Sequence, residues 1–132
     1  MSVSISWYDE AHRAIFQRYE AKWTWDDLLH ASEETRTLAE SVPYNVILFI
    51  DMSQGNQLPQ GNILAHGRSA FNTMSPNITH LIVAMESRLF KTFAELTLKM
   101  LPQWRDRVRL VDTFEKGQRL VEEVIAENAL SN

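Results

Sequence analysis

The run NVILFID, residues 45–51, decides the fold of this chain. Its apolar residues, Val46 to Ile50, follow one another without a break and lie between turn-forming residues. An uninterrupted apolar run of this length is typical of a strand buried on both faces. Such strands occur in sheets that helices cover on both sides. The run therefore predicts the central strand of a parallel or mixed α/β sheet.

The residues before this strand predict a hairpin and a helix. Residues 3–8 alternate between apolar and polar side chains, as a strand does, and residues 14–21 can return as the second strand. A helix is expected from about residue 25 to residue 41. It ends there because Pro43 disfavours helical backbone at the preceding residue.

The residues after the central strand predict an alternation of helices and strands. The expected elements are a helix at 63–74, a strand at 79–85, a helix at 87–101, a strand at 108–111 and a helix at 112–127. The order β-β-α-β-α-β-α-β-α predicts one α/β domain over residues 1–132. Its sheet is mixed, mostly parallel and five-stranded, with about four helices and an antiparallel strand at one edge.

The stretch WTWDD, residues 23–27, has two interpretations. The first is a helix start, with Thr24 as N-cap, Asp27 completing a capping box, and Trp23 and Leu28 at the spacing of a hydrophobic staple. Leu28, Leu29 and Leu38 would then face inward. The second is an aromatic platform for stacking nucleobases, which needs a basic groove. The acidic neighbours favour the helix start.

Composition excludes several classes of function. The 132 residues carry a net charge of −4 and include no cysteine, which excludes disulfides and thiolate metal sites and disfavours a nucleic-acid partner. The first residues lack the pattern of a signal peptide, and VILFI is too short to span a bilayer. The four histidines show no metal-binding spacing. We therefore expect a cytoplasmic, bacterial protein without a membrane span, metal or cofactor.

The end of the central strand offers the best candidate site. Open α/β sheets bind ligands beyond the carboxyl ends of their strands, and Asp51 stands at that point. Polar side chains follow it in the next loop and at the starts of the next two helices. The candidate ligand- or partner-binding residues are Asp51, Ser53, Gln57, Gln60, Asn62, His66, Ser87 and Arg88. The alternative is that these side chains only cap turns and helices.

A catalytic role has weaker support. His66 could approach Asp51, and a histidine beside a carboxylate can act as a general base. However, the chain has no nucleophile elbow, and GNILAHG, residues 61–67, is neither a phosphate-binding loop nor a dinucleotide fingerprint. We expect no enzymatic activity and no catalytic residues.

The hairpin, the WTW helix start, NVILFIDMS, HLIVAMESRLFKTF and RVRLVDTFEKGQRLVEE together resemble small bacterial STAS-like proteins. These are relatives of anti-sigma-factor antagonists, with a fold akin to the lipid-binding CRAL-TRIO domain. The antagonists switch by phosphorylation of a serine at the start of the helix after the central strand. Here Gln60, Gly61 and Asn62 stand at that place, so the resemblance implies a domain without the phosphoswitch.

Two functions follow from this resemblance. The first is a non-enzymatic regulatory or sensory domain that binds a protein partner or a small molecule, with residues 53–74 as the contact surface. The second is a carrier or sensor of a lipid or other apolar ligand, which needs an apolar cavity beneath helices such as 88–101. The exposed edge of the hairpin also offers a route to a homodimer.

Overall fold

The computed structural model describes the backbone of residues 2–54 and 58–131, and within these residues five strands form one sheet. The strands are β1 (Val3–Trp7), β2 (Ala14–Tyr19), β3 (Val46–Asp51), β4 (Ile78–Ala84) and β5 (Val108–Val111), and they lie side by side in chain order. β1 is antiparallel to β2, and the other neighbours are parallel. The predicted α/β class and element order are confirmed.

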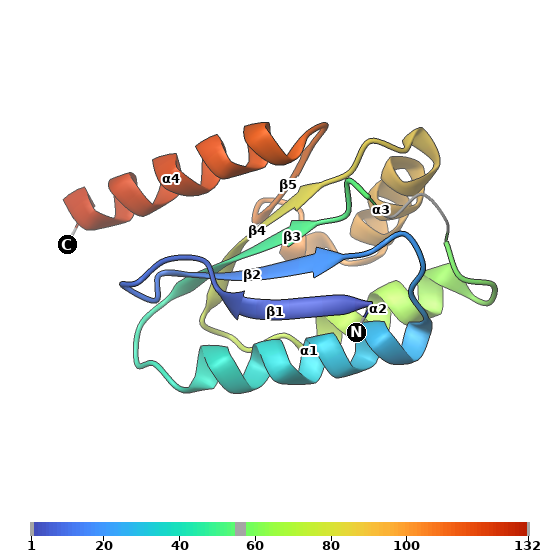
Figure 1. Cartoon of the computed structure of the whole chain (residues 1–132), viewed down its shortest axis with the longest axis horizontal. Coiled ribbons are helices and arrows are strands. Elements are labelled where there is room, and N and C mark those ends of the chain that lie inside the picture. The colour runs from blue at the N-terminus through green and yellow to red at the C-terminus, as the bar shows by residue number, and fades with distance from the viewer. Residues whose placement is uncertain (1, 55–57, 132) are drawn as a thin grey trace.

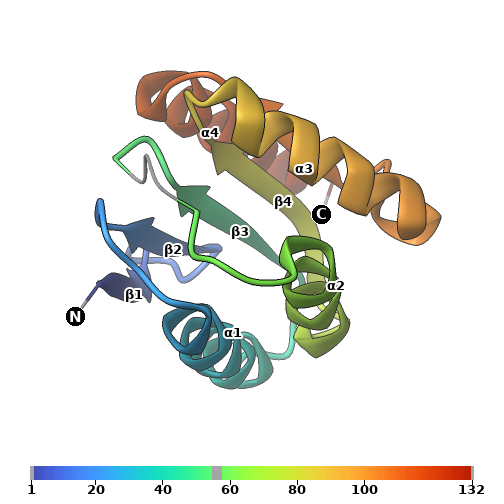
Figure 2. The ribbon, with the colours of Figure 1, turned by 90° about the vertical axis from the view of Figure 1, so that its right-hand side faces the viewer.

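Helices cover both faces of this sheet (Figure 1). α1 (Trp25–Glu40), α2 (Ile63–Thr73) and α3 (Arg88–Met100) lie on one face, and α4 (Phe114–Ser131) lies on the other. Figure 2 shows α2 between α1 and α3, and α2 contacts both of them. A short 3-10 turn, Pro102–Trp104, joins α3 to β5. No helix in the described part of the chain could cross a membrane.

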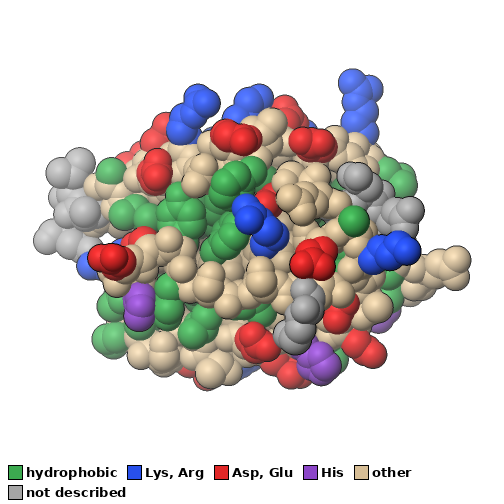
Figure 3. Space-filling view, viewed as in Figure 1, with side chains coloured by type: hydrophobic (Ala, Val, Ile, Leu, Met, Phe, Trp, Pro, Cys, Tyr) green, Lys and Arg blue, Asp and Glu red, His purple; other side chains and the backbone are tan. Residues whose placement is uncertain are grey.

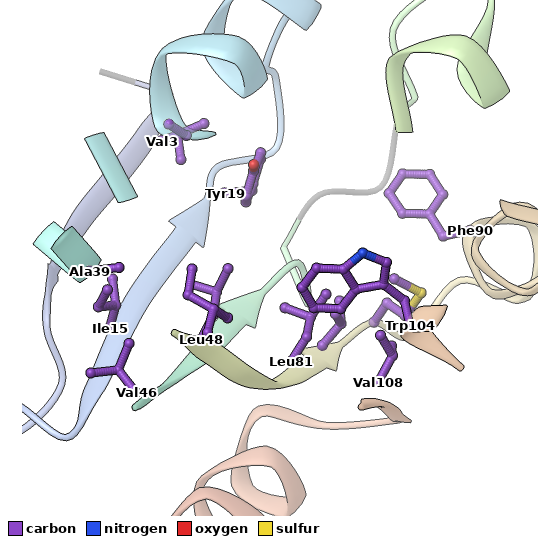
Figure 4. Packing of buried hydrophobic residues seen from close by; sticks show 14 of the residues in the cluster. Val3, Ile15, Tyr19, Ala39, Val46, Leu48, Leu81, Phe90, Trp104 and Val108 are labelled. Carbon is purple, nitrogen blue, oxygen red and sulfur yellow. The ribbon is translucent and has the colours of Figure 1, made fainter. Parts of the chain in front are cut away.

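β3 is buried on both faces, as its apolar run predicts. Val46 and Leu48 point into the core beneath α1, α2 and α3, whereas Ile47 and Phe49 point into the core beneath α4. The first core is the larger, and Figure 4 shows Leu81 between Val3 of β1 and Val108 of β5. The sheet therefore separates two cores, and successive residues of β3 point into different ones.

α4 packs unusually close to β3. A Cβ atom added to Gly117 would lie 2.5 Å from Cε1 of Phe49, a distance that no real contact tolerates. One turn earlier, the ring of Phe114 stacks on Phe49 with 5.6 Å between centroids and 4° between planes. Glycine at position 117 is therefore what allows the helix backbone to approach the Phe49 ring.

The start of α1 has the expected cap. The Thr24 hydroxyl accepts from the Asp27 amide at 3.1 Å, and Asp27 Oδ2 accepts from the Thr24 amide at 2.8 Å. The prediction that Leu29 faces inward is wrong, because its side chain is 44% exposed. Smaller residues, Ala31, Thr35 and Ala39, form the buried stripe instead and bring the helix close to the sheet.

A buried polar cluster explains why this stripe includes Thr35. Gln17 on β2 points towards α1, and its Nε2 donates to Thr35 Oγ1 at 2.7 Å. The Tyr19 hydroxyl donates to Gln17 Oε1 at 3.1 Å. All three residues are buried, so Gln17 needs both of the others, and each of them needs Gln17, as a hydrogen-bond partner. This cluster fixes the rotation of α1 on the sheet.

Candidate ligand-binding pocket

An apolar pocket of about 160 Å³ lies between the sheet and the three helices on its larger-core side. The strands contribute side chains from their shared face, and α2 and α3 cover them. Its lining residues are Trp23, Trp25, Leu28, Ile50, Met52, Leu58, Ile63, Gly67, Ala70, Phe71, Met74, Leu81, Val83, Met85, Phe90, Phe93, Ala94, Thr97, Leu98, Val108 and Leu110. Figure 4 shows one of them, Phe90, projecting inward from α3.

The helix pattern explains where these side chains point. The α2 residues in the lining, Ile63, Gly67, Ala70 and Phe71, follow the spacing of one helix face, and the C-cap residue Met74 continues it. The same helix buries none of its residues fully, although all eleven are described. A helix that covers a sheet without burying one side chain leaves space beneath it.

Small side chains on the facing helices account for that space. Gly67 and Ala70 on α2, and Ala94 on α3, all line the pocket. A Cβ added to Gly67 would lie 3.4 Å from Cγ2 of Thr97, which is an ordinary contact. The backbones of α2 and α3 are therefore near one another at this point, while the side chains are too short to fill the volume beneath.

Almost every polar side-chain atom of the lining already has a hydrogen-bond partner. The Thr97 hydroxyl donates to the Phe93 carbonyl at 2.9 Å, and Trp25 Nε1 donates to the Gln60 carbonyl at 2.8 Å. The exception is Trp23. Its indole Nε1 is buried and has no hydrogen-bond partner among the described residues.

Trp25 also contacts the loop before α2 and holds it in place. The His66 ring stacks on Trp25, with 4.5 Å between centroids and 11° between planes. Gly61 lies against the same ring with φ +130°, a backbone conformation that favours glycine. Together with the bond to the Gln60 carbonyl, these contacts hold the segment from Leu58 to α2 beside the pocket.

Asp51, the leading candidate from the sequence, lies outside this pocket. Its carboxylate is 2% exposed and accepts from Arg18 Nε at 3.0 Å and from the Ser53 amide at 3.0 Å. Strand alternation places Asp51 and Phe49 on the same face of β3, beneath α4. Asp51 thus forms an ion pair with Arg18, which was not expected from the sequence, and a turn with the Ser53 amide, which the alternative interpretation predicts.

Two of the other candidates are helix caps. Asn62 caps α2 by accepting from the Ala65 amide at 3.1 Å, and Ser87 caps α3 by accepting from the Phe90 amide at 3.3 Å. Arg88 is exposed at the start of α3, and Gln57 lies outside the described residues. Of the predicted site residues that the structure describes, none lines the apolar pocket.

The structure does not bring Asp51 and His66 together. Asp51 faces α4, whereas His66 stacks on Trp25 on the opposite face of the sheet and lines a separate hollow of about 110 Å³ between α1 and α2. Within residues 2–54 and 58–131, no three acidic or histidine side chains are close enough to hold a metal ion. The geometry offers no acid–base pair at these positions.

Charge is mixed on the face that Figure 3 shows. The described Lys and Arg side chains there are scattered among Asp and Glu, and hydrophobic side chains appear between them. A phosphate backbone is bound by gathered basic side chains. This face lacks that arrangement among its described residues.

The carrier function expected from the sequence needs an apolar cavity beneath residues 88–101, and α3 does line this pocket. The lining residues were not named as a site, because they look like ordinary core. One signal was present in the sequence: Gly67 and Ala70 stand on the apolar face of the helix expected at residues 63–74. Small residues at such positions indicate either close helix packing or unfilled volume, and the sequence does not distinguish the two.

Comparisons of the chain with protein-family models, curated proteins and solved structures gave no match. The likeness to STAS-like proteins therefore stays a prediction from the sequence.

Proposed function

We propose that this chain is a non-enzymatic regulatory or sensory domain that binds a small apolar molecule between the sheet, α2 and α3. The observation that carries this proposal is the pocket of about 160 Å³ with its apolar lining. Protein interiors are close-packed and contain few voids larger than a water molecule. A dry apolar cavity of about 150 Å³ is large enough to take up benzene.

This volume limits the ligand. A single aromatic ring with a short substituent, or a short branched aliphatic chain, matches the space. The long acyl chain of a lipid does not, so of the two apolar classes expected from the sequence we favour the smaller molecule.

A sensory role gains support from the place of α2 in the chain. α2 covers the pocket and also falls inside residues 53–74, the segment that the STAS-like resemblance suggests as a partner surface. Filling the pocket would press on the underside of α2, while a partner would contact its outer side. Through this one helix, ligand binding would affect partner binding.

The test is an NMR titration of the methyl groups with toluene. We expect shifts confined to pocket residues such as Ile50, Leu81 and Val83. Ala70→Leu fills the pocket and should abolish them. The matched control is Ala65→Leu, which makes the same change on the same helix at an exposed position outside the lining. Shifts that are spread over the surface, or that are equal in both variants, would refute the proposal.

A further inference from the structure

β1 is the edge strand of the sheet, and two backbone bonds show which of its residues face β2 (Figure 1). The Tyr8 amide donates to the Ala14 carbonyl at 2.8 Å. At the other end of the strand, the Glu20 amide donates to the Ser2 carbonyl at 2.8 Å. Bonded and non-bonded residues alternate along an antiparallel pair. The even-numbered residues of β1 therefore bond to β2, and the odd-numbered ones do not.

The odd-numbered residues leave a row of backbone groups at the edge of the sheet. The N–H and C=O groups of Val3, Ile5 and Trp7 point away from β2. Among the described residues, no other strand lies beside β1 on this side. Such a row is a template for pairing with another strand.

β1 lacks the features that usually keep an edge strand from pairing. Natural edge strands are protected by charged side chains, by proline, by bulges or by being very short. The sequence of β1, VSISW, has no charged residue and no proline, and its register with β2 runs without a bulge. The opposite edge strand, β5, is one residue shorter and exposes Arg109. Of the two edges, β1 is therefore the one suited to pairing.

We propose that β1 pairs antiparallel with β1 of a second copy of this chain, in a register centred on Ile5, so that the two sheets become one. Val3 then lies opposite Trp7 of the second copy, and Ile5 lies opposite Ile5. Each of these pairs exchanges both of its backbone hydrogen bonds. A register shifted by two residues would leave Val3 or Trp7 without a partner in the facing β1 strand. The strand is therefore its own best complement.

The side chains agree with this register on both faces of the sheet. Val3, Ile5 and Trp7 pack on the core beneath α1, so the pairs on that face are Val3 with Trp7 and Ile5 with Ile5. Pairs of aromatic and β-branched side chains stabilise antiparallel strands. On the other face, Ser4 lies opposite Ser6 of the second copy. The strands carry no charge, so pairing them brings no like charges together.

A hollow beside Val3 supports the same register. It has a volume of about 40 Å³ and lies between β1 and α1, where its lining consists of Val3, Ile5, Asp27, His30, Ala31 and Glu34. Because Trp7 of the second copy stands opposite Val3, its indole ring would lie at this hollow. The pairing would thus cover apolar surface as well as bond the two backbones.

Ser4 and Ser6 test the register, because both side chains are exposed and each lies opposite the other across the proposed dimer. The double variants Ser4→Lys with Ser6→Glu, and Ser4→Glu with Ser6→Lys, place opposite charges face to face and should keep the dimer. The double variants with lysine at both positions, or glutamate at both, place like charges there. They should raise the dissociation constant of the dimer about tenfold, the effect of two unfavourable cross-strand pairs.

Sedimentation velocity on the full chain measures the equilibrium between the 15.3 kDa monomer and its dimer. The contact is smaller than the roughly 20 to 30 residues on each side of a stable interface, so the dimer should form reversibly as the concentration rises. Hydrogen exchange adds a residue-level readout in the unmodified protein. Dimer formation should protect the amides of Val3, Ile5 and Trp7, whereas those of Ser4 and Ser6 already bond to β2 and should change little.

Two results would overturn the dimer. One is an unmodified protein that stays monomeric up to about 1 mM, the concentration range of very weak association. The other is a dimer that responds equally to all four double variants, because it would then form through another surface or in another register. None of the described residues that line the apolar pocket belongs to β1, so the proposed function and this dimer succeed or fail separately.

Discussion

Arg18 and Asp51 are direct partners across the β2–β3 pair, and Arg18 Nε donates to Asp51 Oδ2 at 3.0 Å. The guanidinium also lies over the rings of Phe16 and Phe114, at 5.1 and 5.0 Å from their centroids. Asp51 is almost fully buried while Arg18 keeps part of its surface exposed. Arg18 thus covers the buried Asp51 carboxylate on the α4 face of the sheet.

Arg18→Met should lower the free energy of unfolding by about 2 kcal/mol, because it leaves the Asp51 carboxylate buried without its cation. Urea denaturation at neutral pH measures this. The control is Arg36→Met, which removes the exposed Arg36–Glu40 pair and the exposed bond from Arg36 to the Thr73 carbonyl, and should cost less than about 1 kcal/mol. Equal effects of the two variants would contradict a structural role for the buried pair.

Thr35→Val should destabilise the protein by about 1 to 2 kcal/mol. Valine has the shape of threonine but cannot accept from Gln17 Nε2, so a buried amide loses its partner. Thr37→Val makes the same change at an exposed position of α1 and should have little effect. Thermal unfolding of both variants makes the comparison. A Thr35 variant as stable as the Thr37 variant would show that the buried cluster contributes nothing.

Gly117→Ala and Gly67→Ala should change stability in opposite directions. Alanine favours helix over glycine by about 1 kcal/mol at either site. At position 117 the new methyl group meets the buried Phe49 ring, and such overpacking costs about 1 to 3 kcal/mol. At position 67 it meets only Thr97 at contact distance, so the helix preference remains. Chemical denaturation should therefore show that Gly67→Ala is more stable than the unmodified protein and that Gly117→Ala is less stable.

Asp27→Asn should reduce stability by about 1 kcal/mol at pH 7. The hydrogen bond from the Thr24 amide lowers the pKa of Asp27, helped by the Thr24 hydroxyl and by charge on His30. Because the folded pKa is the lower one, the stabilisation is present above the unfolded value of about 3.9 and is lost as pH falls.

The difference in stability between the Asp27→Asn variant and the unmodified protein should therefore stay constant above about pH 5 and disappear towards about pH 2. Asp26→Asn, in the same helical turn, is the control for general charge effects. Melting temperatures of the two variants and the unmodified protein across this pH range measure the difference. A difference that persists at about pH 2 would mean that the carboxylate charge is not what caps α1.

The fold could be predicted from the sequence because local patterns and burial agree. The apolar run of β3, the capping box at Thr24 and the position of Pro43 each have one good structural solution. The exposure of Leu29 could not be predicted in the same way. It depends on the pairing of Gln17 with Thr35, two residues from different elements whose partnership exists only after folding.

The pocket was harder to foresee, because a void is a property of several elements at once. Phe90 and Phe93 look the same in sequence whether they fill a core or line a cavity. Polar residues such as Asp51, Asn62 and Ser87 attract attention as ligands, yet each has a nearby backbone or side-chain partner. The informative signal was that α2 covers the sheet without fully burying any of its eleven residues, which only coordinates reveal.

Because α2 keeps every residue partly exposed, it loses little apolar burial when it moves away from the sheet. Segments with few buried contacts open at a free energy below that of global unfolding. The backbone amides of α2 should therefore exchange with deuterated solvent sooner than those of β3 in the empty protein. Occupation of the pocket by the proposed ligand would slow them, so exchange along this one helix would measure the occupied fraction of the protein in a cell extract.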